Sequence, residues 1–180
     1  MRLMRNLRDA VVFLVVLTAV LFLMQEFGMV DLEKGNVQVV DGDSLREAGV
    51  DIRLYGIDAP EYRQTCFDAN RKEYFCGQKA AQTLRELVRG QDVTCSSLDT
   101  DRYHRAVSIC RAGQLELNAE MVKQGWAVAY IQHSLNYVSA EATAKRAKRG
   151  LWAGTFEPPQ DYRARNRKLR GDMGGVEQPD

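Results

Sequence analysis

The segment RLYGIDAPE, residues 53–61, decides the fold of this chain. Its first half alternates apolar and other side chains, which is typical of a β-strand. An Asp-Ala-Pro sequence then breaks the pattern, and proline favours extended geometry in the residue before it. Because a loop at a strand end presents side chains from a rigid scaffold, we expect Asp58 and Glu61 to belong to an active site. The guanidinium of Arg53 would reach the same place from the strand itself.

Four other segments accompany this one in a fixed order along the chain. They are VVDGDS at 39–44, RYHR at 102–105, NAEMVKQGWAVAY at 118–130 and AKRAKRGLW at 144–152. The tripeptide DGD alone arises by chance in many chains, whereas all five segments in order form a specific signature. Together they resemble the staphylococcal nuclease family, and the resemblance covers roughly residues 36–153.

The resemblance implies an α+β fold, namely a five-stranded OB-type Greek-key β-barrel with about three α-helices. The side-chain pattern agrees with that class. Strands are expected at 36–40, 44–50, 51–57, 91–97, 105–111 and 114–117. Helices are expected at 77–89, at 118–125 with Asn118 as N-cap, and at 137–149.

The resemblance also assigns a metal site. Asp43 and Asp58 match the positions that bind calcium in the family, with the backbone carbonyl of Ala59 as a third protein ligand. Oxygen donors of this kind suit Ca²⁺, a hard cation. Asp41 matches a nearby acid that we expect to act on the metal indirectly, through water.

Three side chains carry the catalytic roles that the resemblance implies. Glu61 matches the general base, or the carboxylate that orients the attacking water. Arg53 and Arg105 match the two arginines that hold the phosphate, since a planar guanidinium can contact two phosphate oxygens at once. The expected reaction is calcium-dependent hydrolysis of DNA or RNA, in which the 5′ oxygen leaves and a 3′-phosphate remains.

Two tyrosines, Tyr103 and Tyr130, match family positions near the substrate, where aromatic rings stack on bases or meet phosphate. His104 departs from the family, which usually has glycine between the tyrosine and the arginine. If that position has a positive φ, histidine there costs backbone strain. His133 is expected to be a loop residue rather than a ligand. The basic run 145–149 is expected to be a solvated helix face, with nucleic-acid contact as the alternative.

Each candidate residue also has an interpretation without catalysis. The DGD sequence suits a hairpin turn, Asp58 could cap the turn before the proline, and Glu61 and Arg105 could be surface charges. Two other functions therefore compete with a nuclease: a non-catalytic OB-fold module that binds nucleic acid, and an envelope domain for protein contacts. The formal net charge of +1 favours neither, so phosphate affinity must come from placed arginines and metal.

The N-terminal residues 1–30 differ in character from the rest of the chain. Three arginines precede an uncharged apolar run at 10–24. We interpret it as a signal anchor or transmembrane helix, with the arginines cytoplasmic and the domain at the extracytoplasmic face. The alternatives are a cleaved signal peptide with secretion and a buried core helix. The nuclease-like domain is expected at 31–155, as a monomer, and a disordered tail at 156–180.

Four cysteines bear on the compartment in which the domain works. An even number behind an export signal predicts two disulfides, Cys66–Cys76 and Cys95–Cys110, out of three possible connectivities. The second pair would meet across an antiparallel hairpin. Four buried thiols are the alternative interpretation. A zinc site is disfavoured because the paired CxxC spacing is missing.

Overall fold

The structure is a computed structural model and describes residues 11–20 and 36–174, with only the backbone for 170–174. The chain divides into two compact units, at residues 1–34 and 35–180. Each unit is a separate body, and the candidate site lies in the second.

Residues 11–20 of the first unit form a helix whose side chains are exposed. Within the described residues, no helix has both the length and the apolar character needed to cross a bilayer. Most of the expected anchor at 1–30 falls outside the described residues. The anchor therefore stays a prediction.

The second unit is built on a six-stranded sheet in the order β1-β2-β3-β8-β7, with β9 paired to β8. Strands β3 and β8 run parallel, and the other pairs are antiparallel. The strands are β1 (Gln38–Val39), β2 (Ser44–Glu47), β3 (Val50–Leu54), β7 (Val93–Thr100), β8 (Ala106–Ala112) and β9 (Leu115–Glu116). Each lies in or close to a predicted range. The fold is therefore mixed α+β, while the pairing among described residues does not join β1 to β7 into the expected closed barrel.

Two short antiparallel pairs stand apart from this sheet. Strand β4 (Ile57–Asp58) pairs with β10 (Val128–Ala129), which brings a distant segment beside the proposed active-site loop. Strand β5 (Cys66–Phe67) pairs with β6 (Glu73–Tyr74). The sequence predicted neither β5, β6 nor β10, because strands of two residues leave no alternation to detect.

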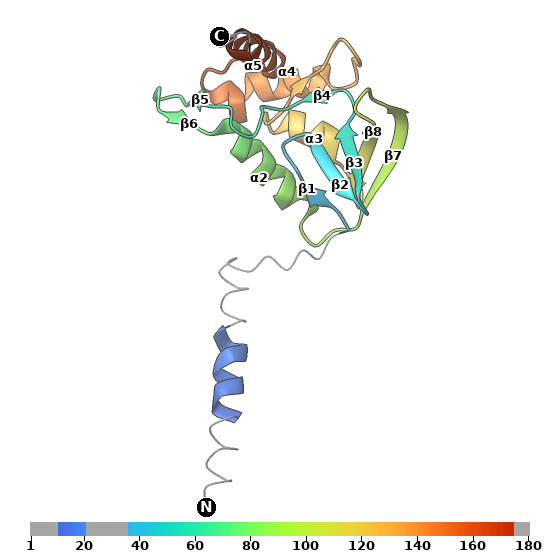
Figure 1. The fold of residues 1–180 in the computed structure, drawn as a ribbon, viewed down its shortest axis with the longest axis vertical. Coiled ribbons are helices and arrows are strands. Elements are labelled where there is room, and N and C mark those ends of the chain that lie inside the picture. Colours follow the sequence, from blue (N-terminus) through green and yellow to red (C-terminus); the bar gives the residue numbers. More distant parts are fainter. Residues whose placement is uncertain (1–10, 21–35, 175–180) are drawn as a thin grey trace, which may run out of the picture. The chain divides into compact units, whose positions relative to one another are not determined.

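The three predicted helices are confirmed within a few residues. They are α2 (Cys76–Val88), α3 (Leu117–Lys123) and α4 (Val138–Arg146), and a 3₁₀ turn, η1 (Gly150–Ala153), follows. In α2 the buried side chains Ala80, Ala81, Leu84 and Val88 recur at helical spacing and face the core. Figure 1 shows α2 beside the sheet, with α4 at the end of the domain where β4 lies.

The segment expected to be a disordered tail contains a further helix, α5 (Pro159–Gly174). A proline in the first turn suits a helix start, because its missing N–H has no intrahelical partner there. The backbone N–H groups of Asp161 and Tyr162 both donate to the carbonyl of Pro158, which closes the first turn. Charged composition alone did not reveal this helix.

Asn118 is not the N-cap that its position suggested. Helix α3 begins one residue earlier, and the buried Asn118 amide joins two strands. Its Oδ1 accepts the N–H of Cys110, and its Nδ2 donates to the carbonyls of Tyr55 and Ser108 at 2.9 and 3.1 Å. The Asn118 side chain thus fixes the end of β3 against β8. Arg53 lies on β3, and Arg105 directly precedes β8.

Both predicted disulfides are present, Cys66–Cys76 and Cys95–Cys110, and the interpretation as four buried thiols is wrong. Cys95 and Cys110 lie directly opposite each other in the pairing of β7 with β8. The first bridge closes the segment that holds the β5–β6 hairpin, directly after the proposed active-site loop. Two bonded pairs accord with an oxidising compartment.

Candidate active site

The DGD turn packs closely against the side chains of two alanines. A side chain on Gly42 would bring its Cβ within 2.7 Å of the Cβ atoms of both Ala59 and Ala80. Glycine therefore lets this turn pack against the IDAP segment and α2. Asp41 closes the turn, since its Oδ1 accepts the N–H of Asp43 at 3.0 Å.

Asp43 and Asp58 are buried and are joined by one arginine. Arg53 donates from Nη1 to Asp43 at 3.2 Å and from Nη2 to Asp58 at 2.9 Å. The other oxygen of Asp43 accepts the N–H of Ala59 at 2.9 Å. The strand and the two acidic turns therefore meet as the sequence predicted.

Glu61 is held in place through its backbone. Its N–H donates to the side chain of the buried Gln64, whose Nε2 donates to the carbonyl of Glu157 at 2.7 Å. A Cβ on Gly77 would meet the carbonyl oxygen of Glu61 at 1.8 Å, so only glycine lets α2 begin against this loop. The Glu61 carboxylate itself remains partly exposed, as a group that contacts substrate must.

A second arginine, Arg163 of α5, also enters this site. Its Nη2 donates to both carboxylate oxygens of Asp58 at 2.8 Å, and its Nη1 donates to Glu61 at 3.1 Å. Sequence reasoning missed Arg163 because it lies among many charged residues with no motif around it. Glu157 and Gln64, which fix the chain just before α5, were missed as well.

These side chains form one acid–arginine cluster with an excess of negative charge. It consists of Asp41, Asp43, Asp58, Glu61, Arg53 and Arg163. Four acids against two arginines give a formal charge of −2. Burial, followed by the charge of Asp43, raises the pKa of Asp41 to about 7. Burial also raises the pKa of Asp58, although the hydrogen bonds from Arg163 act in the opposite direction.

The acid–arginine cluster contains carboxylate oxygens that suit a metal cation and two arginines that pair with these carboxylates. Within the described residues, no three acidic, histidine or cysteine side chains already lie together as a metal-binding group. The reason is visible in the contacts: arginines and backbone N–H groups hold the oxygens of Asp43 and Asp58. All four cysteines are bonded in disulfides, which leaves oxygen chemistry for any cation.

Arg105 lies outside the cluster, before the start of β8. In the parallel pairing of β3 with β8, Arg53 lies opposite Val107. Val107 comes two residues after Arg105 in the sequence. Strand alternation therefore places Arg105 on the same face of the sheet as Arg53. Its guanidinium donates to Asp101 through Nε at 2.8 Å and Nη2 at 2.7 Å. Among the described residues, its hydrogen bonds and ion pair go to Asp101 and not to Asp43, Asp58 or Glu61.

The turn that carries Arg105 has the strain expected at His104, whose φ is +63°. Asp101 stabilises it, because its Oδ1 accepts the N–H groups of Tyr103 and Arg105. The Tyr103 ring is 62% exposed, with the guanidinium groups of Arg102 and Arg105 over it at 5.0 and 5.5 Å. An exposed ring beside a cation is available to stack on a base.

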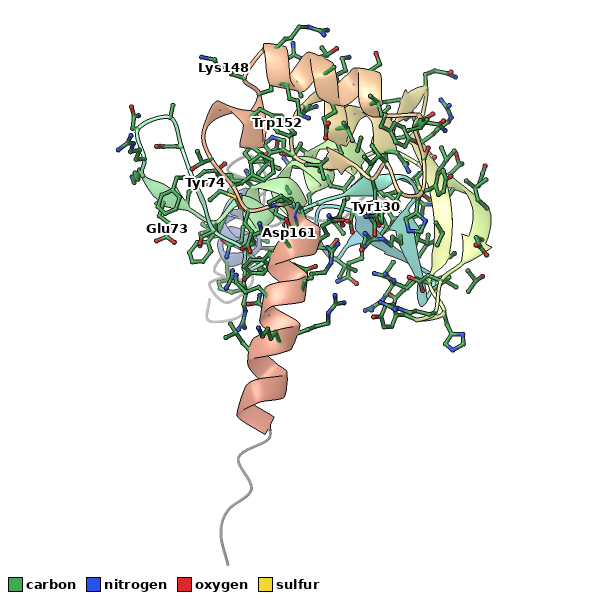
Figure 2. The ribbon with its side chains drawn as sticks, turned by 90° about the horizontal axis from the view of Figure 1, so that it is seen from above. Glu73, Tyr74, Tyr130, Lys148, Trp152 and Asp161 are labelled. Atoms are coloured by element: carbon green, nitrogen blue, oxygen red, sulfur yellow. A yellow bond between two sulfur atoms is a disulfide. The ribbon has the colours of Figure 1, made fainter. Side chains whose placement is uncertain are left out.

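Tyr130 follows β10, whose pairing with β4 places Val128 opposite Asp58. Its ring stacks at a tilt against His133, with 4.7 Å between centroids, and Figure 2 shows it over the strands of the domain. His133 is exposed, as expected for a loop residue. Of the two tyrosines, Tyr130 is thus the one connected to the acid–arginine cluster through strand pairing.

Comparisons with known proteins agree with this geometry. The family described as "Staphylococcal nuclease homologue" matches residues 51–154. An endonuclease of Haemophilus influenzae, named as uncharacterized, is 34% identical over 81% of this chain and 83% of its own length. The succinoglycan biosynthesis protein ExoI of Rhizobium meliloti is 33% identical over 74% of this chain and 72% of its own. A probable staphylococcal-like nuclease, CAN3 of Oryza sativa subsp. japonica, is 32% identical over 67% and 30% respectively.

The family match covers more than half of the chain, and it includes β3 and the loop that carries Asp58 and Glu61. The relative from Haemophilus influenzae exceeds 30% identity over most of both chains. The chain belongs to the staphylococcal nuclease family and is of the nuclease class of hydrolases.

Proposed function

We propose that this protein is a calcium-dependent nuclease that hydrolyses phosphodiester bonds of DNA, RNA or both and leaves 3′-phosphate ends. The observation that carries the proposal is the meeting of Asp43, Arg53, Asp58 and Glu61 in one cluster. A domain that only binds nucleic acid has no need for buried acids beside a partly exposed carboxylate.

The donor set fits a hard cation. The cluster carries a formal charge of −2, and a cation bound there would offset this excess of negative charge. Asp43, Asp58 and the Ala59 carbonyl would hold calcium, with Asp41 beside them. The chemistry that calcium supplies there, when bound, is neutralisation of phosphate charge.

The remaining steps are assigned to side chains of the chain itself. Arg53 and Arg105 bind the phosphate and stabilise the added negative charge of the transition state. Glu61 orients a water molecule and accepts its proton as the oxygen attacks phosphorus. The bond from phosphorus to the 5′ oxygen then breaks, and that oxygen takes up a proton from solvent, which gives a 5′-hydroxyl and a 3′-phosphate. Tyr103 and Tyr130 position the neighbouring nucleotides, preferably in single-stranded or flexible segments.

The location is part of the proposal. The apolar run after three arginines supports a domain anchored through residues 1–30 on the extracytoplasmic side, and the two disulfides support an oxidising compartment. A secreted protein cleaved after this segment is the alternative. We propose that the domain acts as a monomer.

Chelation tests the metal. Purified protein should cut a labelled single-stranded oligonucleotide in calcium, and excess chelator should abolish cleavage. Asp43→Asn should weaken calcium dependence and rate together, because one anionic ligand is lost. Magnesium should support cleavage poorly, since it demands stricter octahedral geometry. Undiminished cleavage in excess chelator would remove the metal from the mechanism.

A further inference from the structure

Of the two arginines in the acid–arginine cluster, Arg163 makes more hydrogen bonds to the acids, and it lies outside the segment matched by the family. Its Nη2 engages both oxygens of Asp58 at 2.8 Å, while Nη1 reaches Glu61. The Asp58 side chain is 1% exposed and that of Arg163 is 28% exposed. A charged guanidinium nitrogen shared between both oxygens neutralises a buried carboxylate, as a bound metal ion would.

A cation coordinated by Asp58 needs the same oxygen atoms. Arg53 already donates to Oδ1 of Asp58, so both of its oxygens are occupied when Arg163 is in place. Arg163 also covers an oxygen of Glu61, the carboxylate assigned to orient water. The arginine therefore holds the metal ligand and the catalytic base at the same time.

Helix α5 has little else to hold it against the domain. After Pro159, which is buried, none of its described side chains up to residue 169 is buried. Figure 2 shows the helix leaving the domain from Asp161 onward. Its start is fixed because Gln64 donates to the carbonyl of Glu157. Most helical stability in proteins comes from tertiary packing, so α5 depends strongly on the contacts of Arg163.

We propose that Arg163 and calcium exchange at Asp58, so that α5 closes the site without metal and is released when metal binds. This inference rests on the proposed function and adds its regulation. Two ligands that compete for one group weaken each other reciprocally. Metal at Asp58 loosens α5, and docking of α5 raises the calcium concentration that the site requires.

The test compares calcium binding by the full-length protein and by Arg163→Gln, using titration calorimetry. The variant should bind calcium about fivefold more tightly or better, the lower end of coupling between linked sites. Arg165→Gln is the matched control, because Arg165 lies on the same helix but pairs with Glu157 outside the cluster. It should bind calcium as the parent does.

Hydrogen exchange supplies a second readout. In the parent protein, calcium should accelerate exchange of the α5 amides, and in Arg163→Gln these amides should exchange rapidly with or without calcium. Unchanged or weaker calcium binding by Arg163→Gln would overturn the proposal, as would α5 amides that calcium leaves protected in the parent.

The outcomes separate this proposal from the proposed function. Protein that binds calcium and loosens α5 but cuts no nucleic acid would contradict the nuclease and leave the exchange intact. Calcium-dependent cleavage that Arg163→Gln slows without tightening calcium binding would contradict the exchange alone, and would make Arg163 a phosphate contact. Failure of every protein to bind calcium would overturn both.

Discussion

Arg53 and Arg105 are assigned the same task, yet the molecule holds them in different ways. Arg53 lies on β3 with two buried acids as partners and only 19% of its side chain exposed. Arg105 lies in a turn before β8, bound to the partly exposed Asp101. The first is part of the acid–arginine cluster, whereas the second lies outside it in the RYHR turn, with 26% of its side chain exposed.

The difference indicates that the two arginines contribute to the reaction in different ways. An arginine between two buried carboxylates is fixed before substrate arrives, and it also neutralises charge that would otherwise destabilise the fold. An arginine on a turn can approach phosphate as the substrate binds. Arg53 should therefore affect stability and catalysis together, and Arg105 catalysis alone.

Removing the charge of each arginine tests that division, and the largest effect is expected at Arg53. Arg53→Gln should lower turnover by about 10²-fold or more and the free energy of unfolding by about 3 kcal/mol, because Asp43 and Asp58 lose a shared partner. Arg105→Gln, the matched variant, should lower turnover but leave stability near that of the parent. Denaturant titration together with initial rates measures both. An equal loss of unfolding free energy in both variants would contradict the proposed difference between the two arginines.

A smaller effect is expected from Asp101, which orients Arg105. Asp101→Asn keeps an oxygen for the N–H groups of Tyr103 and Arg105 but loses the ion pair. Turnover should fall about tenfold, since a positioned group is left less well aligned. Asp99→Asn is the control, because Asp99 is an exposed acid on the same hairpin and its carboxylate accepts the N–H of Thr100 rather than a hydrogen bond from Arg105. An Asp101→Asn enzyme as fast as the parent would mean that the turn alone positions the arginine.

The smallest effect is expected at His104, where φ is +63°. His104→Gly should raise the free energy of unfolding by about 1 kcal/mol, because glycine adopts this conformation without steric cost. His104→Ala keeps a Cβ and should bring no such gain. Thermal or denaturant unfolding of both variants measures the difference. Loss of stability in the glycine variant would show that histidine contributes contacts that outweigh its strain.

The central part of the site could be predicted because its residues are close in sequence. Asp43, Arg53 and Asp58 lie within one hairpin and the turn that follows it, so local strand geometry already brings them together. Both disulfides followed from an even cysteine count behind an export signal, and hairpin geometry supported the Cys95–Cys110 pair. The helix at 77–89 had a clear apolar periodicity and the helix at 137–149 an alanine-rich, basic composition, and the boundaries of both were recovered to within a few residues.

The rest depended on contacts that leave no local signal. Arg163 lies 105 residues after Asp58 in sequence, in a charged segment whose helix buries almost nothing. Gln64 is fully buried although it is polar, because its amide joins the Glu61 loop to the start of α5. Asn118 was predicted from its type as a helix cap, and its bonds to β3 and β8 appear only in three dimensions.

The most direct test of the account separates catalysis from binding at Glu61 and Arg105. Glu61→Gln keeps the shape of the side chain and loses the base, and Arg105→Lys keeps the charge and loses the planar fork. Turnover and affinity for a single-stranded oligonucleotide should be measured on both, with thermal melting as the control for folding. We predict that turnover falls about 10²-fold or more, that affinity changes far less, and that both variants melt cooperatively near the parent temperature. Cleavage at the parent rate by both variants would contradict the catalytic assignment and favour a domain that only binds nucleic acid.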